Sequence, residues 1–222
     1  MHLGIIPDGN RRWAKKRGLT ANHGHQEGCH ALSRLLNYFI DHSTIDTLTI
    51  YAFSLENTQR PKHEIIGISQ LFNDFITKNL PKFIDHHVHV RVVGDRGLMA
   101  KKDIETCHQL ESATSLKRYS GKALKTLNLC YYYSGQWHLK NMFHQSQSSQ
   151  HTFEHLMDQS IAPMDLLIRT GKEFRISNFC LWQLAYAELL FLDIFWPEIT
   201  VNHITEALSW YQSRQRRYGG GV

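Results

Sequence analysis

The stretch Ile5-Ile6-Pro7-Asp8-Gly9-Asn10-Arg11-Arg12-Trp13 joins a short apolar run to a carboxylate, a Gly-Asn turn, two guanidinium groups and an indole. Asp8 can hold a divalent cation, and Gly9 lets the backbone come close to a ligand. The free N–H groups at the start of the following helix favour an anion, as do Arg11 and Arg12. The stretch therefore predicts that metal and phosphate chemistry meet where a first buried strand ends.

Strand-like and helix-like segments alternate along the rest of the chain. This alternation is typical of an α/β fold in which helices cover both faces of a mostly parallel central sheet. We expect about six strands in a single domain that spans residues 1–222, with a mobile tail at residues 219–222. The expected strands are Leu3–Ile6, Thr47–Phe53, Val88–Val93, Leu127–Tyr133, Met164–Ile168 and Leu189–Leu192. The expected helices are Asn10–Lys16, Gln26–His42, Ile65–Ile84, Asp103–Ser115, one from about Gln136, Asn178–Glu188 and Val201–Arg217, with a solvated loop at Gln145–Gln150.

The charge balance favours an anionic partner, because the formal net charge is +5. Nucleic acid, an acidic membrane surface and a phosphorylated small molecule all fit this balance. The basic residues are dispersed, which disfavours nucleic acid, and no Walker-type or Gly-x-Gly-x-x-Gly loop is present. The four cysteines form no C-x-x-C pair, and polar residues interrupt the longest apolar stretch, Phe179–Trp196. We therefore expect a cytoplasmic protein without a transmembrane helix.

Two further polar loops follow predicted strands. The carboxyl ends of parallel strands are where such sheets bind ligands, so we expect both loops to converge with Asp8 on one edge. The loop Ser54–Arg60 offers hydroxyl, carboxylate, amide and guanidinium groups. An ordinary Asn/Pro loop that leads into a helix explains the same composition.

The second loop begins at Arg169, just past an apolar strand, where a cation needs a partner. Arg169, Arg175 and the Ser177 hydroxyl are candidates for a diphosphate clamp. Ser177 equally suits the N-cap of a helix that begins at Asn178.

Glu188 is expected near the end of an almost wholly apolar helix. A buried carboxylate in that place needs an arginine, a lysine or a metal as its partner. Asp8 and Glu188, together with several arginines, suit a site for Mg²⁺ and a diphosphate, since this ion is usually held by one or two carboxylates and phosphate oxygens.

The chain resembles the cis-prenyltransferases, the undecaprenyl diphosphate synthase (isoprenyl transferase) family, nearly from end to end. The motifs that carry the resemblance are Asp8-Gly-Asn-Arg-Arg-Trp-Ala, Gly24-His25-x-x-Gly28, Tyr51-Ala-Phe-Ser-x-Glu-Asn57 with Arg60-Pro61, Gly94-Asp95, Asp165-Leu-Leu-Ile-Arg-Thr-Gly-x-Glu-x-Arg-Ile-Ser-Asn-Phe179, Leu181-Trp-Gln-x-Ala-Tyr-x-Glu188, Trp196-Pro197 and Arg216-Arg217-Tyr218-Gly219. Each motif is weak alone, but all of them in this order are highly specific.

The resemblance implies a homodimeric, Mg²⁺-dependent transferase that adds isopentenyl diphosphate to an allylic diphosphate, with farnesyl diphosphate as the expected primer. The product would be a polyprenyl diphosphate such as undecaprenyl diphosphate, the lipid carrier for cell-wall glycans, which partitions to the membrane. The enzyme would then be cytoplasmic or peripheral at the inner membrane face. Because the growing chain is hydrocarbon, an apolar tunnel is expected, lined by Ile65–Ile76 with Leu48, Ile50 and Ala52.

The same resemblance assigns roles to individual residues. Asp8 would bind Mg²⁺ and assist loss of the allylic diphosphate, with Glu188 as the second metal ligand. Asn57 would take part in removal of the proton. The other implied positions are Gly9, Asn10, Arg11, Arg12, Trp13 and His25 around the allylic diphosphate, Ser54, Glu56 and Arg60 beside Asn57, Arg169, Arg175 and Ser177 on isopentenyl diphosphate, and Arg217 and Gly219 reaching across the dimer.

The sequence departs from the family pattern near the allylic side. Ala21 stands where many members carry an arginine, for which Arg17 is a candidate substitute, and Tyr132–Gln136 lacks a usual arginine. Two alternatives to a long-chain synthase follow. The first is a diverged enzyme that makes a shorter or branched prenyl diphosphate. The second is a non-catalytic partner subunit of a two-component prenyltransferase, although such partners usually lack the first Asp.

Overall fold

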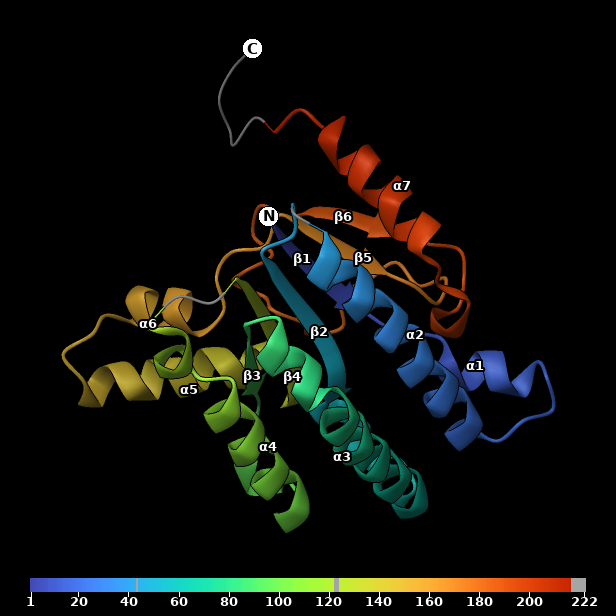
Figure 1. The fold of residues 1–222 in the computed structure, drawn as a ribbon, viewed down its shortest axis with the longest axis horizontal. Coiled ribbons are helices and arrows are strands. Elements are labelled where there is room, and N and C mark those ends of the chain that lie inside the picture. Colours follow the sequence, from blue (N-terminus) through green and yellow to red (C-terminus); the bar gives the residue numbers. More distant parts are fainter. Residues whose placement is uncertain (43, 122–123, 217–222) are drawn as a thin grey trace.

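Six parallel strands form one central sheet in the computed structural model, which describes residues 1–42, 44–121 and 124–216. The strand order is β3-β4-β2-β1-β5-β6, and every neighbouring pair is parallel (Figure 1). The strands are β1 (His2–Ile6), β2 (Thr47–Ser54), β3 (Val88–Val93), β4 (Lys125–Tyr133), β5 (Leu166–Arg169) and β6 (Glu188–Phe191). The expected α/β fold with a parallel sheet of six strands is confirmed.

Helices cover both faces of the sheet, as parallel sheets require. The helices are α1 (Asn10–Lys15), α2 (Ala21–Asp41), α3 (Lys62–Asp85), α4 (Lys101–Ala113), α5 (Gly135–Ser148), α6 (Phe153–Ser160) and α7 (Val201–Gln212). One apolar cluster joins the sheet to α2, α3, α4 and α7. A second, smaller cluster joins the opposite face of the sheet to α5 and to the segment 176–187.

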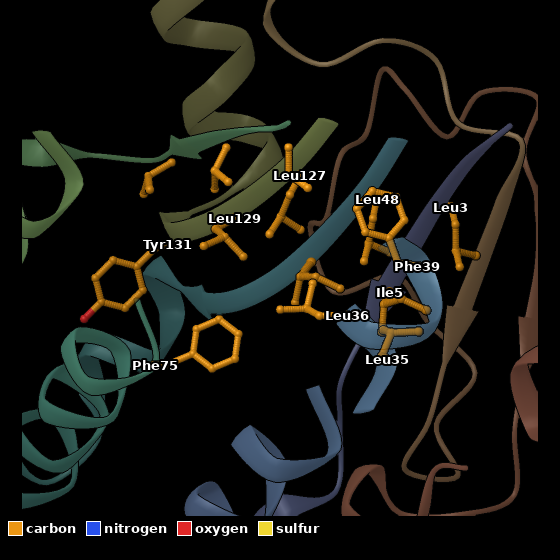
Figure 2. Packing of buried hydrophobic residues seen from close by; sticks show 14 of the residues in the cluster. Leu3, Ile5, Leu35, Leu36, Phe39, Leu48, Phe75, Leu127, Leu129 and Tyr131 are labelled. Carbon is orange, nitrogen blue, oxygen red and sulfur yellow. The ribbon is translucent and has the colours of Figure 1, made fainter. Parts of the chain in front are cut away.

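The larger cluster is built from alternate strand residues and one stripe of α2. Leu3, Ile5 and Leu48 are fully buried, and Leu36 and Phe39 of α2 pack over them (Figure 2). Because β1, β2, β4 and β5 are largely buried on both faces, they read as nearly continuous apolar runs in the sequence. This is why their positions are predictable to within a few residues.

Helix boundaries differ from the expected ones where polar residues cap or extend a helix. The second helix begins at Ala21, five residues before the predicted start, because the Thr20 side chain accepts a hydrogen bond from the His23 amide. The predicted loop Gln145–Gln150 is wrong for its first part, since α5 continues to Ser148. Glutamine is a good helix former, and a polar run can lie on the solvent face of a helix. The short helix α6 is not anticipated at all.

The predicted helix Asn178–Glu188 is wrong, because these residues form a series of turns and Glu188 begins β6. Ser177, Asn178 and Cys180 have positive φ angles of 49°, 62° and 40°. L-residues in this left-handed region cannot begin a right-handed helix. The last helix is also shorter than predicted and ends at Gln212.

The strand order brings three polar segments to one edge of the sheet. Asp8 follows β1, Ser54 ends β2 and Arg169 ends β5, and these strands are direct neighbours. The expected convergence at the carboxyl edge is therefore found. No helix in the described ranges is long and apolar enough to cross a membrane.

Two buried histidines make the fold sensitive to acid. Burial lowers the pKa of both His2 and His138 to about 4, so each is neutral in the folded protein at pH 7. The unfolded chain binds a proton at each histidine near pH 6.5. The free energy of unfolding should therefore fall between pH 6.5 and pH 4, by on the order of 3 kcal/mol for each residue.

We predict that urea unfolding at several pH values shows this loss of stability. In His138→Gln, the free energy of unfolding should fall less steeply with pH between pH 6.5 and pH 4. His138 contacts the Tyr133 hydroxyl (2.9 Å) and the Ser160 hydroxyl (2.7 Å), which an amide side chain can partly replace. An unchanged pH dependence of the free energy of unfolding in the variant would contradict the contribution of His138 to acid sensitivity.

Candidate active site

A cavity of about 900 Å³ opens at the carboxyl edge of the sheet. Its polar lining comes from the strand ends and from α1, α2 and η1 (Leu55–Gln59). The predicted site residues that line it are Asp8, Gly9, Asn10, Arg11, Arg12, His25, Ser54, Asn57, Arg60, Arg169, Arg175 and Ser177. One continuous space thus combines a carboxylate, several guanidinium groups and an apolar interior.

Asp8 is fixed from both sides by the backbone and by two arginines. Its amide donates to the Thr170 hydroxyl (3.0 Å), and that hydroxyl donates to the Asp8 carbonyl (2.8 Å). Its Oδ2 atom accepts from Arg169 Nη2 at 2.8 Å and lies 3.0 Å from Arg12 Nη2. The carboxylate is therefore held in one orientation while it stays partly open to solvent.

Arg169 is the most deeply buried cation of the site, with 4% of its surface exposed. Its Nη1 donates to Ser177 Oγ (2.8 Å) and to the Arg175 carbonyl. Ser177 therefore binds the arginine and does not cap a helix. Arg169 Nε and Asn10 Oδ1 are buried without a hydrogen-bond partner among the described residues. Because buried polar atoms are normally satisfied, the cavity is suited to a polar ligand.

Glu173 is a site residue that the sequence reasoning did not single out. Its two carboxylate oxygens bind Arg12 Nη1 (2.8 Å) and Arg175 Nη1 (2.6 Å). The hydrogen bond from Arg175 is the main reason why the pKa of Glu173 lies below its usual value. Glu173 thereby holds two guanidinium groups close together despite their repulsion. The motif Thr-Gly-x-Glu-x-Arg contains this glutamate and could have indicated it.

The loop after β2 positions Asn57 with a reciprocal cap. Ser54 Oγ accepts from the Asn57 amide (3.2 Å), and Asn57 Oδ1 accepts from the Ser54 amide (3.4 Å). Glu56 does not line the cavity and accepts instead from Asn178 Nδ2 (2.8 Å). Its role is to tie this loop to the segment after β5. A second overlooked carboxylate, Glu64, binds His25 and Arg60 from behind the cavity wall.

Some residues predicted for the site lie away from the cavity lining. Trp13 lies outside the cavity lining, and its ring packs against the Arg17 guanidinium at 4.3 Å. Arg17, the candidate substitute for the arginine missing at Ala21, also lies outside the cavity lining and binds Glu198 (3.2 Å). Gly9 has a φ of 108°, and a Cβ there would lie 2.6 Å from the Phe195 ring, so packing also demands this glycine. Arg217 and Gly219, and the predicted mobile tail, lie outside the described residues.

Glu188 lies at the amino end of β6, opposite Leu166, which pairs in turn with Leu3. β1 extends about 10 Å from Leu3 to Ile6, and Asp8 lies two residues beyond Ile6. Glu188 therefore lies well away from Asp8 of its own chain. Its partner is Arg214, whose Nε lies 3.2 Å from Glu188 Oε2. Of the partners considered for this carboxylate, an arginine is the one observed.

The donor set at Asp8 fits a magnesium ion that is shared with a phosphate. The described part of the chain contains no group of three or more His, Cys, Asp or Glu that could hold a metal. Mg²⁺ does not require one, because it is commonly bound by one or two carboxylates together with substrate phosphates and waters. Asp8 is such a carboxylate, surrounded by guanidinium groups that suit a diphosphate.

The interior of the cavity is apolar, as the tunnel prediction requires. Its lining includes Ile50, Ala52, Ile68, Leu71, Phe72 and Phe75. Leu48, Ile65 and Ile76, which were also expected to line the tunnel, do not line the cavity and pack into the core instead. The lining also contains Tyr131, whose ring stacks on Phe72 at 4.1 Å.

Comparison with known proteins agrees with this geometry. The family model for undecaprenyl diphosphate synthase (Prenyltransf) matches residues 6–219. The ditrans,polycis-undecaprenyl-diphosphate synthase ((2E,6E)-farnesyl-diphosphate specific) of Pectobacterium atrosepticum is 37% identical over 99% of this chain and 89% of its own length. The isoprenyl transferase of Halalkalibacterium halodurans is 36% identical over 99% of this chain and 88% of its own length.

Two solved structures share the fold. Lavandulyl diphosphate synthase from Lavandula x intermedia, in complex with dimethylallyl diphosphate, has a TM-score of 0.88 at 26% identity, over 98% of this chain and 97% of that one. A probable undecaprenyl diphosphate synthase from Campylobacter jejuni has a TM-score of 0.80 at 26% identity, with the same coverage.

Fold and site together define an α/β prenyl transferase, with guanidinium groups at the sheet edge and an apolar cavity below them. The chain belongs to the undecaprenyl diphosphate synthase family.

The close approach at Gly171 provides a test of the site. Gly171 has a φ of 93°, and a Cβ there would lie 2.9 Å from Asp8 Cβ and from Arg12 Nη2. Gly121 also has a positive φ (82°), but a Cβ there meets nothing within 4 Å. We predict that Gly171→Ala and Gly121→Ala both lower the free energy of unfolding by about 1 kcal/mol or more, because alanine disfavours this conformation.

Only Gly171→Ala should also weaken the binding of pyrophosphate, measured by calorimetry, since only its methyl group displaces Asp8 and Arg12. Equal pyrophosphate affinities in the two variants would contradict the role of these residues in anion binding.

Proposed function

We propose that this protein condenses isopentenyl diphosphate with an allylic diphosphate, farnesyl diphosphate, to give a polyprenyl diphosphate such as undecaprenyl diphosphate. The observation that carries the proposal is that two guanidinium-rich groups flank the Asp8 carboxylate above one apolar cavity. Relatives named as farnesyl-diphosphate-specific synthases support the same substrates.

The allylic diphosphate is bound on the side of Arg11, Arg12, Asn10 and His25. Loss of this group breaks an allylic C–O bond and leaves a carbocation, so negative charge develops on the departing diphosphate. The guanidinium groups stabilise that charge, and Asp8 would hold Mg²⁺ beside it. Such an ion, when bound, neutralises phosphate charge as a Lewis acid.

Isopentenyl diphosphate is bound by Arg169, Arg175 and Ser177. Its double bond attacks the allylic carbon, a new C–C bond forms, and one proton leaves the isopentenyl unit. An amide is a weak base, so Asn57 directs this proton toward a diphosphate oxygen or a water and does not keep it. The apolar cavity receives the hydrocarbon chain as it grows.

The active form is proposed to be a homodimer, and its product partitions to the membrane. Large apolar side chains are exposed near the edge strand β6, among them Phe174 (82%) and Tyr186 (69%). Such a patch is typical of a protein–protein interface. A second chain would also offer a way to bring Glu188, and the segment with Arg217 and Gly219, to a neighbouring cavity.

The non-catalytic alternative lacks support, because one cavity contains Asp8, His25, Asn57 and Arg169 together. A shorter or branched product is not favoured by the relatives at 35–37% identity, which are named undecaprenyl diphosphate synthases or isoprenyl transferases.

Asp8→Asn should reduce the turnover of isopentenyl and farnesyl diphosphates with Mg²⁺ by about a hundredfold or more. The substitution keeps the size of the side chain but removes the charge that holds the cation and the two arginines. Asp46→Asn is the matched control, because Asp46 binds the N-terminal amine at the opposite edge of the sheet (2.6 Å). Near-normal turnover by Asp8→Asn would refute its central role, and no chain-extended product from the wild type would refute the proposed function.

Product length should depend on the aromatic wall of the cavity. The Tyr131 hydroxyl donates to Asp103 Oδ2 (2.9 Å), which holds the ring against Phe72. We predict that Tyr131→Ala gives longer products than the wild type, because it removes a ring from the apolar space, whereas Tyr131→Phe retains the ring and the product length. Chromatography of the dephosphorylated products measures the distribution. An unchanged distribution in Tyr131→Ala would show that another residue limits the chain.

A further inference from the structure

The carboxylate of Glu64 lies just outside the cavity and has no role in the steps above. Glu64 is in the first turn of α3, is 2% exposed and does not line the cavity. Its Oε1 atom lies 3.0 Å from His25 Nε2, 3.2 Å from Arg60 Nη1 and 3.7 Å from Arg11 Nε. These three side chains do line the cavity. One buried oxygen therefore connects α1, α2 and the start of α3.

The arrangement has a clear electrostatic reason. Two guanidinium groups that converge on one anion repel one another when the anion is absent. Burial lowers the pKa of His25 and of Arg60, and Glu64 opposes both shifts. Burial would raise the pKa of Glu64, but the hydrogen bond from His25 and the charges of Arg60 and Arg11 hold it below its usual value. Glu64 is thus an ionised hydrogen-bond acceptor, and its charge favours the protonated forms of His25 and Arg60.

Arg12 and Lys15 of α1 also line the cavity. Ala21 lines it and offers no charge, and Arg17 is bound to Glu198 away from the lining. The other carboxylates act elsewhere, since Asp8 binds Arg12 and Arg169 and Glu173 binds Arg12 and Arg175. The donors that Glu64 holds therefore form a distinct group.

We propose that Glu64 is a positioning residue for the allylic diphosphate, which holds His25, Arg60 and Arg11 in one converging arrangement before the substrate binds. Donors that are oriented in advance need no reorganisation when the anion arrives, so affinity is gained without a new contact to the substrate. The inference rests on the proposed function, because it assigns Glu64 to one of the two diphosphate subsites. None of the contacts given above joins Glu64 to Arg169, Arg175 or Ser177, so its effect is confined to the allylic side.

Steady-state kinetics with Glu64→Gln tests the proposal. The glutamine keeps the shape and one acceptor oxygen but removes the charge. We expect the KM for farnesyl diphosphate to rise roughly tenfold or more, the loss expected for a weakened charge-assisted hydrogen bond, and the KM for isopentenyl diphosphate to stay unchanged. A purely structural role would lower the melting temperature without separating the two KM values.

Glu111→Gln is the matched control. Glu111 accepts from Arg96 Nη2 (2.7 Å) and from the Val92 amide (2.9 Å), and it does not line the cavity. This variant should leave both KM values unchanged. Glu64→Asp, which keeps the charge but shortens the side chain, should show an intermediate KM for farnesyl diphosphate and replaces Glu64→Gln if the latter does not fold.

Unchanged KM values for farnesyl diphosphate in an active Glu64→Gln or Glu64→Asp variant would overturn the proposal. Calorimetry with farnesyl diphosphate separates this failure from failure of the proposed function. If the wild type binds farnesyl diphosphate but makes no product, the proposed function fails, and weaker binding by Glu64→Gln than by Glu111→Gln still supports the positioning role. Equal binding by these two variants overturns that role in either case.

Discussion

The ion pair between Asp8 and Arg169 is the contact on which the active site depends. The two residues are 161 positions apart in the sequence, yet β1 and β5 pair in a register that sets Ile6 opposite Arg169. A parallel sheet is what makes this possible, because it brings the carboxyl ends of distant strands to one edge. Thr170 then fixes the Asp8 backbone by two hydrogen bonds. An arginine as buried as Arg169 needs this carboxylate, since an unpaired buried charge is very costly.

Around this pair, three carboxylates keep the cations of the cavity in place. Asp8, Glu173 and Glu64 each contact at least two guanidinium groups. Five arginines of the cavity lining share these three carboxylates, so an excess of positive charge remains for diphosphates. They are Arg11, Arg12, Arg60, Arg169 and Arg175. The cavity thus keeps a positive potential that favours anions, while the carboxylates offset the repulsion among the arginines and hold them in place.

The sequence predicts the parts of this design that depend on local patterns. Apolar strands buried on both faces are visible as continuous runs, and motif spacing identifies Asp8, Arg169 and Ser177. Glu64 escapes such reasoning, because its importance comes only from the cations that the fold brings around it, whereas the motif Thr-Gly-x-Glu-x-Arg contains Glu173 and could have indicated it. Glu188 illustrates the opposite case. The need of its carboxylate for a partner is predictable, but the choice of Arg214 depends on β6 and on the chain after α7, which the pattern of apolar residues does not reveal.

The segment after β5, where a helix is predicted and turns are found, shows why local helix propensity fails next to the active site. The sequence after Ser177 is apolar and looks helical, but three left-handed residues exclude a helix. Such strain persists only when surrounding contacts fix it. Asn178 provides several of them: its carbonyl accepts from the Gly135 amide (2.6 Å), its Oδ1 from the Gln136 amide (3.0 Å), and its Nδ2 donates to Glu56 (2.8 Å). Asn178 therefore connects the loop after β2, the start of α5 and the segment after β5, and this connection keeps the adjacent Ser177 hydroxyl on Arg169 in the cavity.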